Sequence, residues 1–285
     1  MNTTVQAALW MSGAIVSFSS MAVAGRAISL ELDTFEIMLF RSIVGFMVVL
    51  AVAGATGHLH EVSRRNLGLH ALRNLCHFTG QNLWFFALTA IPLAQVFALE
   101  FTSPLWAILL SALLLGERIT KARALAGVLG FIGILIVARP SADTLSVGQI
   151  AAAVAAIGFA GSAVFTRLLT RSETITCVLF YLTAMQAVMG LIAAGYDGDI
   201  ALPSLSATPW LVLIALAGLL AHFCMTTALK LAPASVVMPV DFLRLPLIAV
   251  LGLLVYGEAL DLWVLVGAVI IFTANSINIR AELSR

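Results

Sequence analysis

Charged residues are scarce in this chain of 285 residues: Asp, Glu, Lys and Arg make up 10%, and hydrophobic residues make up 61%. A soluble domain of this length carries about 25% charged residues. The mean hydropathy of +1.07 indicates more apolar surface than one water-soluble core can bury, so the sequence predicts an integral membrane protein. The formal net charge is +1 and there is no basic tract, so nucleic acid is not an expected partner.

Cysteines and catalytic motifs are also scarce. The three cysteines, Cys76, Cys177 and Cys224, fall in separate apolar stretches, so neither a disulfide framework nor a zinc site is expected. The chain has no H-E-x-x-H, no G-x-S-x-G and no Walker-type glycine loop with lysine, which mark metalloproteases, hydrolases and nucleotide-binding proteins. The sequence therefore predicts no metal, no cofactor and no enzyme activity, and it argues against a self-contained ATP-driven pump.

Apolar stretches long enough to cross a bilayer, about 17–25 helical residues each, occur about ten times. Only the connections 54–68 and 197–208 exceed a tight turn, so no soluble domain is left to hold an active site. The sequence predicts an all-α membrane fold of ten transmembrane helices. The expected spans are about Val5–Ile28, Thr34–Ala53, His70–Thr89, Leu93–Leu115, Ala122–Val137, Val147–Leu169, Thr174–Tyr196, Pro209–Leu229, Ala234–Val255 and Leu262–Ile279.

A repeat at an offset of 141 residues relates the two halves of the chain. The stretch Ala87–Glu117 recurs as Ala228–Glu258, and its acid Glu100 becomes Asp241. Further equivalent pairs are Arg26 and Arg167, Pro92 and Pro233, Phe101 and Phe242, and Gly116 and Gly257. One register linking points over half the chain indicates two homologous units, which we place at residues 1–139 and 140–285.

Charges in the connections predict the orientation. Basic residues of the loops and the C-terminal tail alternate to one side, and Arg139 is the single basic residue of the opposite loops. Because basic loops stay in the cytoplasm, both termini are expected there, in a bacterial inner membrane. Each half has five spans, an odd number, so the second half enters the membrane in the opposite sense. Inverted repeats of this kind support alternating access.

The repeated pattern resembles a known family. It consists of Pro92–Val96 followed by Gly116-Glu117, and Pro233–Val237 followed by Gly257-Glu258, in a chain of ten spans. In this it is similar to the EamA family of the drug/metabolite transporter superfamily, and within it to YddG-type exporters of aromatic amino acids. The resemblance implies a basket-like bundle around a central cavity lined by spans one, three, four, six, eight and nine. It also implies export of small metabolites.

Acids inside apolar spans are the first candidates for substrate binding. A charge at mid-membrane costs about 2.5–3.5 kcal/mol, so Glu100 is expected to face the bundle interior, to bind a substrate amine or a proton, or to pair with an arginine. Pro104 has no N–H to donate to the Glu100 carbonyl, which predicts a loosened turn and a hinge. Asp241 and Arg244 share a helix face, either as an internal ion pair or as a clamp for a zwitterionic amino acid. Pro239 and Pro246 flank this pair and predict a second hinge.

Polar residues on other spans give further candidates. His77, Gln81 and Trp84 share a helix face, which is expected to line the cavity or to form interhelical hydrogen bonds. His222 is the repeat equivalent of Gln81 and is a second histidine candidate beside the alternative of simple packing. On the first span, Ser17 and Trp10 are candidates for the cavity wall, and a close helix contact is the alternative for Ser17.

Two arginines and several glycines complete the list. Arg26 and Arg41 lie inside expected spans, where Glu36 or Glu100 is expected to neutralise them unless they snorkel to an interface. Small residues allow close helix packing; they are Gly127, Gly130, Gly133, Gly267 and Ala268.

These features together predict a secondary transporter that exports small organic metabolites, with apolar or aromatic amino acids as the first choice of substrate. We expect a monomer that exposes a midplane site to one side at a time, driven by proton exchange or by downhill flux. The alternatives are an importer or exchanger of a nucleoside- or sugar-like metabolite, an intramembrane enzyme, and a passive channel.

Overall fold

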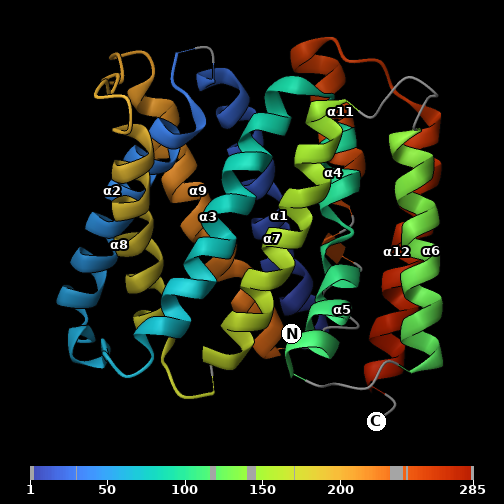
Figure 1. The fold of residues 1–285 in the computed structure, drawn as a ribbon, viewed down its shortest axis with the longest axis horizontal. Helices are drawn as coiled ribbons and strands as arrows, with labels where there is room; N and C mark the ends of the chain where they lie inside the picture. The colour runs from blue at the N-terminus through green and yellow to red at the C-terminus, as the bar shows by residue number, and fades with distance from the viewer. Residues whose placement is uncertain are drawn as a thin grey trace.

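The structure is a computed structural model that describes residues 3–29, 31–115, 120–139, 146–169, 171–231, 240–241 and 243–283. These residues form helices and connections without any strand, and the helices stand side by side as a bundle (Figure 1). The elements are α1 (Thr3–Ile28), α2 (Thr34–Ala55), the short 3-10 helix η1 (Leu59–Glu61), α3 (Leu67–Ala90), α4 (Leu93–Glu100), α5 (Ser103–Leu115), α6 (Lys121–Ala138), α7 (Val147–Leu169), α8 (Ile175–Ala194), α9 (Thr208–Leu231), α11 (Arg244–Tyr256) and α12 (Leu262–Leu283).

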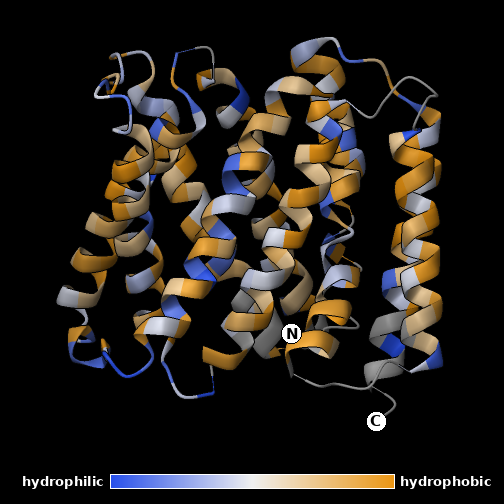
Figure 2. Cartoon of the chain, viewed as in Figure 1, coloured by the Kyte–Doolittle hydropathy of each residue, from blue (hydrophilic) through white to orange (hydrophobic). Residues whose placement is uncertain are grey.

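Length and hydropathy agree with a membrane fold. Among the described residues, six segments are long and apolar enough to cross a bilayer, and three shorter apolar helices accompany them. The helix α3 fails this criterion because it carries a row of buried polar side chains, visible as blue bands along its length (Figure 2). Its position among the other helices hides this polar row from lipid. The predicted all-α, ten-span fold is confirmed, with the fourth span divided into α4 and α5.

The 141-residue register is visible in the helix boundaries. The start residues of α8, α9, α11 and α12 are each 141 positions after those of α2, α3, α5 and α6. The last residues of α7, α9 and α11 follow those of α1, α3 and α5 by the same offset. In Figure 1 the first helix α1 runs upward and its counterpart α7 runs downward. The structure is therefore an inverted repeat.

Helices of one half pack mainly against helices of the other half, so the halves are not separate units. The most extensive contacts are those of α1 with α9 and of α3 with α7, which are equivalent pairs under the repeat. Gly80 and Gly158 permit the second contact, since a Cβ on Gly158 would lie 2.8 Å from both the Cys76 carbonyl oxygen and the Gly80 Cα. Small residues bring membrane helices close in this way, so the bundle is held mainly across the repeat boundary.

The expected glycine seam of the fifth span is confirmed in part. Gly133 of α6 faces Gly267 of α12, and a Cβ on Gly133 would lie 3.0 Å from the Gly267 carbonyl oxygen. Gly130 packs against Leu105 of α5. Gly127 has no atom within 4 Å of its Cβ position, so the expectation is wrong for that residue because it faces outward.

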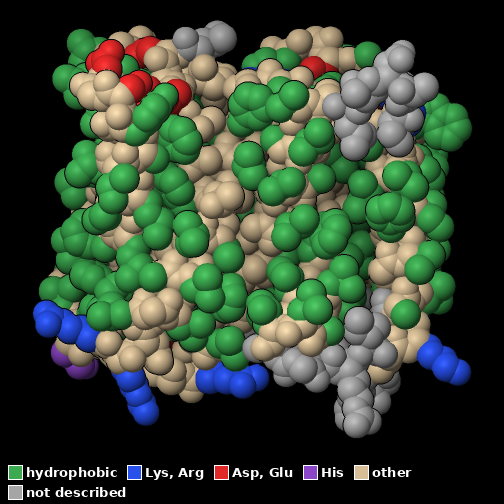
Figure 3. Space-filling view, in the orientation of Figure 1, with side chains coloured by type: hydrophobic (Ala, Val, Ile, Leu, Met, Phe, Trp, Pro, Cys, Tyr) green, Lys and Arg blue, Asp and Glu red, His purple; other side chains and the backbone are tan. Residues whose placement is uncertain are grey.

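The surface separates into an apolar middle and two charged faces (Figure 3). Carboxylates gather on the face where α1 ends and α2 begins, called here the acidic face. Lys and Arg gather on the opposite face, called here the basic face, where α12 ends. Between them the exterior is largely hydrophobic, as a lipid-facing belt requires.

Candidate substrate-binding site

The fourth span is interrupted beside its acid. The helix α4 ends at Glu100, Phe101 and Thr102 form a turn, and α5 begins at Ser103. Pro104 therefore lies in the first turn of α5, where proline is well tolerated, and not in the middle of one kinked helix as predicted. The Phe101 carbonyl oxygen accepts a hydrogen bond of 2.8 Å from the side-chain amide of Asn275 on α12. Such a partner stabilises non-helical backbone at membrane depth.

The ninth span has an equivalent interruption. Val240 and Asp241 are helical, Leu243 forms a turn, and α11 begins at Arg244. Pro246 is the third residue of α11, again in a first turn, and Pro239 lies outside the described residues. In the first repeat a helix ends at the acid, and in both repeats a new helix starts three residues after the acid.

The interruptions bring three charged side chains together. The Arg244 guanidinium nitrogen Nη2 lies 3.0 Å from Asp241 Oδ2 and 3.3 Å from Glu100 Oε1. The Trp84 indole N–H donates to Glu100 Oε2 at 2.7 Å. Two carboxylates face one guanidinium, so this acid–arginine cluster carries an excess negative charge when both acids are ionised. The expected Asp241–Arg244 ion pair is present, and the structure joins Glu100 and Trp84 to it.

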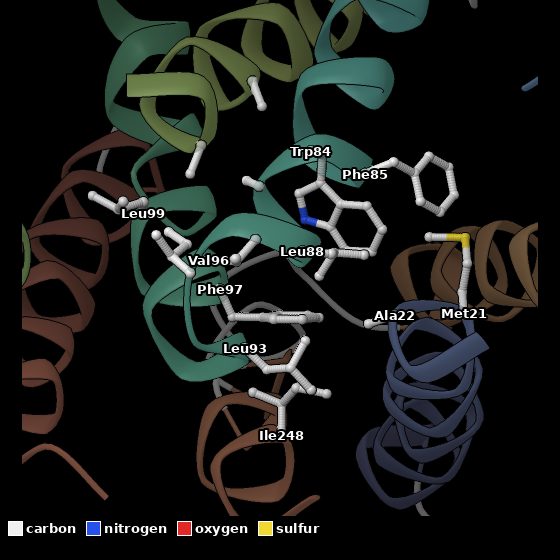
Figure 4. Packing of buried hydrophobic residues seen from close by; sticks show 14 of the residues in the cluster. Met21, Ala22, Trp84, Phe85, Leu88, Leu93, Val96, Phe97, Leu99 and Ile248 are labelled. Carbon is white, nitrogen blue, oxygen red and sulfur yellow. The ribbon is translucent and has the colours of Figure 1, made fainter. Parts of the chain in front are cut away.

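Aromatic rings enclose the guanidinium. Its central carbon lies 4.8 Å from the Phe18 ring centroid, 5.0 Å from Phe97 and 4.9 Å from Phe101. Trp84 meets Phe97 edge to face at 5.9 Å, and the apolar packing around them includes Ile248 of α11 (Figure 4). Cation–π contacts at desolvated sites stabilise a cation by about 2 kcal/mol. The sequence reasoning missed these phenylalanines, although Phe97 and Phe101 flank Glu100 at helical spacing.

The cluster has unfilled hydrogen-bonding capacity. Asp241 Oδ1 and Arg244 Nε are buried and have no hydrogen-bond partner among the described residues. A buried polar atom without a partner costs roughly 1–3 kcal/mol. The Asp241–Arg244 pair therefore keeps one unfilled acceptor and one unfilled donor among the described residues.

Some of the remaining candidate residues lie beside the acid–arginine cluster, and others lie apart from it. The rings of His77 and His222 meet edge to face at 6.3 Å between centroids, and His222 also meets Phe18 edge to face at 5.6 Å. Gln81 is buried on α3 between His77 and Trp84 in sequence, and Ser17 is buried on α1 next to Phe18.

Trp10 does not reach the cluster. Its side chain is 38% exposed and packs edge to face on Phe223, which is 59% exposed. Among the described residues, no aromatic contact joins Trp10 to the acid–arginine cluster, and its expected place in the cavity wall stays a prediction.

Neither acid expected to neutralise Arg26 and Arg41 does so. Glu36 accepts hydrogen bonds from the backbone N–H groups of Asp33 at 2.9 Å and Ala201 at 2.6 Å. Glu100 is held by Arg244 and Trp84, as above. Arg26 pairs instead with Glu258.

Arg26 and Glu258 close the acidic face above the cluster. Arg26 also donates to the carbonyl oxygens of Leu88 and Ile91, and Glu258 Oε2 accepts the Leu93 N–H at 2.9 Å. Gly257 adopts a left-handed conformation with φ of 66° and turns the chain after α11 toward this contact. One ion pair therefore joins α1, the α3–α4 corner and the end of α11. We call it the outer latch.

One group of residues has metal-ligand chemistry near the basic face. Ligand atoms of His70, Glu173 and Cys177 lie within 4.8 Å of one another. Glu173 Oε1 already accepts the Asn66 side-chain amide at 2.6 Å, and Cys177 Sγ accepts the Ser63 N–H at 3.4 Å. Protein donors occupy the two atoms that a cation needs most, so these contacts account for the group as a link between α3, α8 and the loop before α3.

Comparison with known sequences decides the family. Residues 5–139 and 146–279 both match the EamA-like transporter family. The chain belongs to this family. It is 34% identical to a riboflavin transporter of Brucella anthropi over 76% of this chain and 78% of the relative. It is 27% identical to an S-adenosylmethionine uptake transporter of Rickettsia bellii over 96% of this chain and 93% of the relative.

A further relative and a solved structure extend the comparison. The chain is 27% identical to a pseudopaline exporter of Pseudomonas aeruginosa, over 90% of each chain. A crystal structure 19% identical in sequence has a TM-score of 0.65 and matches 95% of this chain and 96% of that one, which supports the fold. The protein is a multi-pass membrane transporter of the drug/metabolite superfamily. Its relatives are transporters, not enzymes, and they include both an uptake system and an exporter.

Proposed function

We propose that this transporter carries a small organic metabolite with an amine and an aromatic or planar body, bound at the acid–arginine cluster. The observation that carries the proposal is the excess carboxylate at Glu100 and Asp241, together with the open acceptor Asp241 Oδ1. A substrate ammonium group would occupy that acceptor and balance the charge. The rings of Trp84, Phe97 and Phe101 supply apolar surface beside it, as small-molecule sites do.

The cluster also revises the clamp proposed for a zwitterionic amino acid. Arg244 is already neutralised by two acids, so a substrate carboxylate at Arg244 would meet two like charges. The amine of an aromatic amino acid fits the cluster, and its carboxylate needs another partner. We retain amino acids with aromatic side chains as one candidate substrate, and export is the proposed direction.

Alternating access follows from the inverted repeat. We propose that the repeats 1–139 and 140–285 work as a monomer in which helices paired across the repeat boundary rock around the midplane site. We also propose that the basic face lies in the cytoplasm of an inner membrane and that Glu100 carries the coupled proton. The outer latch closes the acidic face in the conformation described here. Both interruptions, at Phe101–Thr102 and at Leu243, provide backbone that can change direction without breaking helix hydrogen bonds.

The test is reconstitution into liposomes with labelled L-tryptophan, S-adenosylmethionine and riboflavin, with and without a proton gradient. We expect an amine-bearing compound to be transported, Glu100→Gln to lower its uptake at least tenfold, and the gradient to change its accumulation. Arg65→Met is the matched control, because Arg65 is exposed in a loop. Transport that Glu100→Gln leaves intact would contradict the assigned site, and indifference to the gradient would remove proton coupling.

A second candidate is a neutral heteroaromatic compound. It is favoured by the 34% identity to a riboflavin transporter and by the ring-lined site. The same liposomes separate the two candidates: riboflavin transport that survives Glu100→Gln but falls with Phe97→Ala would support the neutral substrate.

A further inference from the structure

Two arginines inside the bundle have no acidic partner among the described residues. Arg73 of α3 is 6% exposed and donates to Thr166 Oγ1 at 3.1 Å and Asn74 Oδ1 at 3.0 Å, which are neutral groups. The hydrogen bond of Arg41 on α2 is a weak one to the Met38 sulfur at 3.8 Å. A guanidinium in the membrane interior is normally paired with an acid. This pair of cations therefore lacks an anion.

The guanidinium of Arg41 borders a small, partly enclosed cavity of about 20 Å³ between α2, α8 and α9. The polar lining consists of Arg41, Ser42, Thr183, Gln186 and His222. Gln186 is 1% exposed, and its Nε2 has no hydrogen-bond partner. Gly218 of α9 allows the close approach, since its Cβ position lies 3.8 Å from Arg41 Nη2. An unpaired cation and an unfilled amide donor thus face one space, and both would bind an anionic oxygen.

The cavity adjoins the acid–arginine cluster. Phe18 contacts Arg244 on one side at 4.8 Å and His222 on the other at 5.6 Å. Arg41, Arg73, His77 and His222 are close enough for their electrostatic fields to interact. The interior is therefore polarised, with excess negative charge at Glu100 and Asp241 and excess positive charge at Arg41 and Arg73. A neutral substrate would leave both ends uncompensated.

We infer that the cavity lined by Arg41, Thr183, Gln186 and His222 receives an anionic oxygen from an acidic group of the transported substrate, a carboxylate or a phosphate. The substrate is then amphoteric, with its cationic end at Glu100 and Asp241 and its planar body across Phe18. This inference rests on the proposed function, because it assumes that the other end of the same molecule occupies the acid–arginine cluster.

The test measures binding to the purified protein in detergent, with probes that differ only in the acidic group. Tryptamine carrying a carboxylate on the indole ring is compared with tryptamine for a carboxylate, and serotonin O-phosphate with serotonin for a phosphate, so that each acidic probe carries its amine and its acid at opposite ends of the ring. A charge-assisted hydrogen bond at a buried site changes affinity about ten- to hundredfold. We expect the acidic member of at least one pair to bind at least tenfold more tightly, and the pair that shows this identifies the group.

Variants assign the preference to the cavity. Arg41→Met is expected to remove the difference within that pair and to leave the affinity of the acid-free member unchanged. Arg41→Lys keeps the charge and is expected to keep part of the difference, which also tests the cavity if the methionine variant does not fold. Arg65→Met, in an exposed loop, is the matched control and is expected to bind as the unaltered protein does.

The outcomes separate this inference from the proposed function. Equal or tighter binding of both acid-free members, or a difference that survives Arg41→Met, overturns the acidic-group site. Tryptamine binding that Glu100→Gln weakens would still support the amine site in that case. Failure of all four probes to bind contradicts the inference and the proposed function together.

Discussion

The outer latch gives a prediction with a calculable size. Changing Glu258 to Gln removes the charge that faces Arg26 and weakens the bond from the Leu93 N–H. Both side chains of the ion pair are 15% exposed, so solvent screens them far less than an open surface pair. Hydrogen bonds to charged groups contribute about 1.5–3 kcal/mol. Taking about 2 kcal/mol, at 1.4 kcal/mol per factor of ten, the acidic face should open about 30-fold more often.

Opening is measured by the labelling of an introduced cysteine. Ala22 is fully buried on α1, one turn from Arg26 and one turn from Phe18, so along α1 it lies between the latch and the cluster. In a background without Cys76, Cys177 and Cys224, Ala22→Cys should react slowly with an impermeant maleimide in intact cells. Adding Glu258→Gln should raise that rate at least tenfold, and inside-out vesicles should show no such rise.

The matched control is the second ion pair of the same face. Arg139 and Asp261 are 50% and 32% exposed, so their pair contributes about 0.2–1 kcal/mol. Asp261→Asn should therefore change the labelling rate of the Ala22→Cys protein less than about fivefold. Equal rates for the Glu258 and Asp261 variants would refute the reasoning, because the latch would then be no stronger than a surface pair.

Three further predictions concern the site and its support. Trp84→Phe keeps an aromatic ring but removes the bond to Glu100, and should weaken binding of the transported amine about tenfold in the liposome assay, whereas Trp210→Phe, at an exposed position, should not. Asn275→Ala removes the hydrogen bond that its side-chain amide donates to the Phe101 carbonyl and should cost about 0.5–1.5 kcal/mol of stability, measured as a lower melting temperature. Thr273→Val, exposed on the same helix, should leave the melting temperature unchanged. Gly158→Val must displace the backbone of α3 at Cys76 and Gly80 and should destabilise by about 1–3 kcal/mol, while Gly127→Ala, with open space around it, should be neutral in the same measurement.

Much of the fold could be predicted because it depends on local patterns. Apolar runs gave the helices, and the register of 141 residues recurs in the helix boundaries. The positions of the two interruptions followed from acids and prolines in otherwise apolar spans. Glu100, Asp241, Arg244 and Trp84 meet because polar groups on membrane helices turn away from lipid.

The partners of several charges could not be predicted, because they depend on how distant helices meet. Arg26 binds Glu258 across 232 residues, whereas Glu36 and Glu100 are closer in sequence and bind elsewhere. The exposure of Trp10 could not be predicted, since α1 is apolar all round and such a helix does not reveal which side is buried. The phenylalanines around Arg244 were missed for the same reason, because a phenylalanine in an apolar span does not indicate which side chain it contacts.

Comparison of the two repeats shows where function has changed the ancestral symmetry. The latch residues keep their chemistry, since Arg26 and Glu258 have Arg167 and Glu117 as equivalents, although Glu117 and the side chain of Arg167 lie outside the described structure. The proposed binding residues differ between the repeats, because Arg244 corresponds to Ser103 and Arg41 to Leu182. Two carboxylates in equivalent positions would repel each other. Arg244, which is present in one repeat alone, lies between them and reduces this repulsion. It also makes the acid-rich part of the site different from the part that contains Arg41. Opening and closing at the two membrane faces is therefore expected to use equivalent residues in the two repeats. Binding of one substrate in one orientation requires that the residues of the site differ between the repeats. On this argument, Glu117 and Arg167 form a second latch, at the basic face. Glu117→Gln should then favour opening at the basic face and slow the labelling of Ala22→Cys from outside, which is the reverse of the effect of Glu258→Gln. Faster labelling would contradict a second latch.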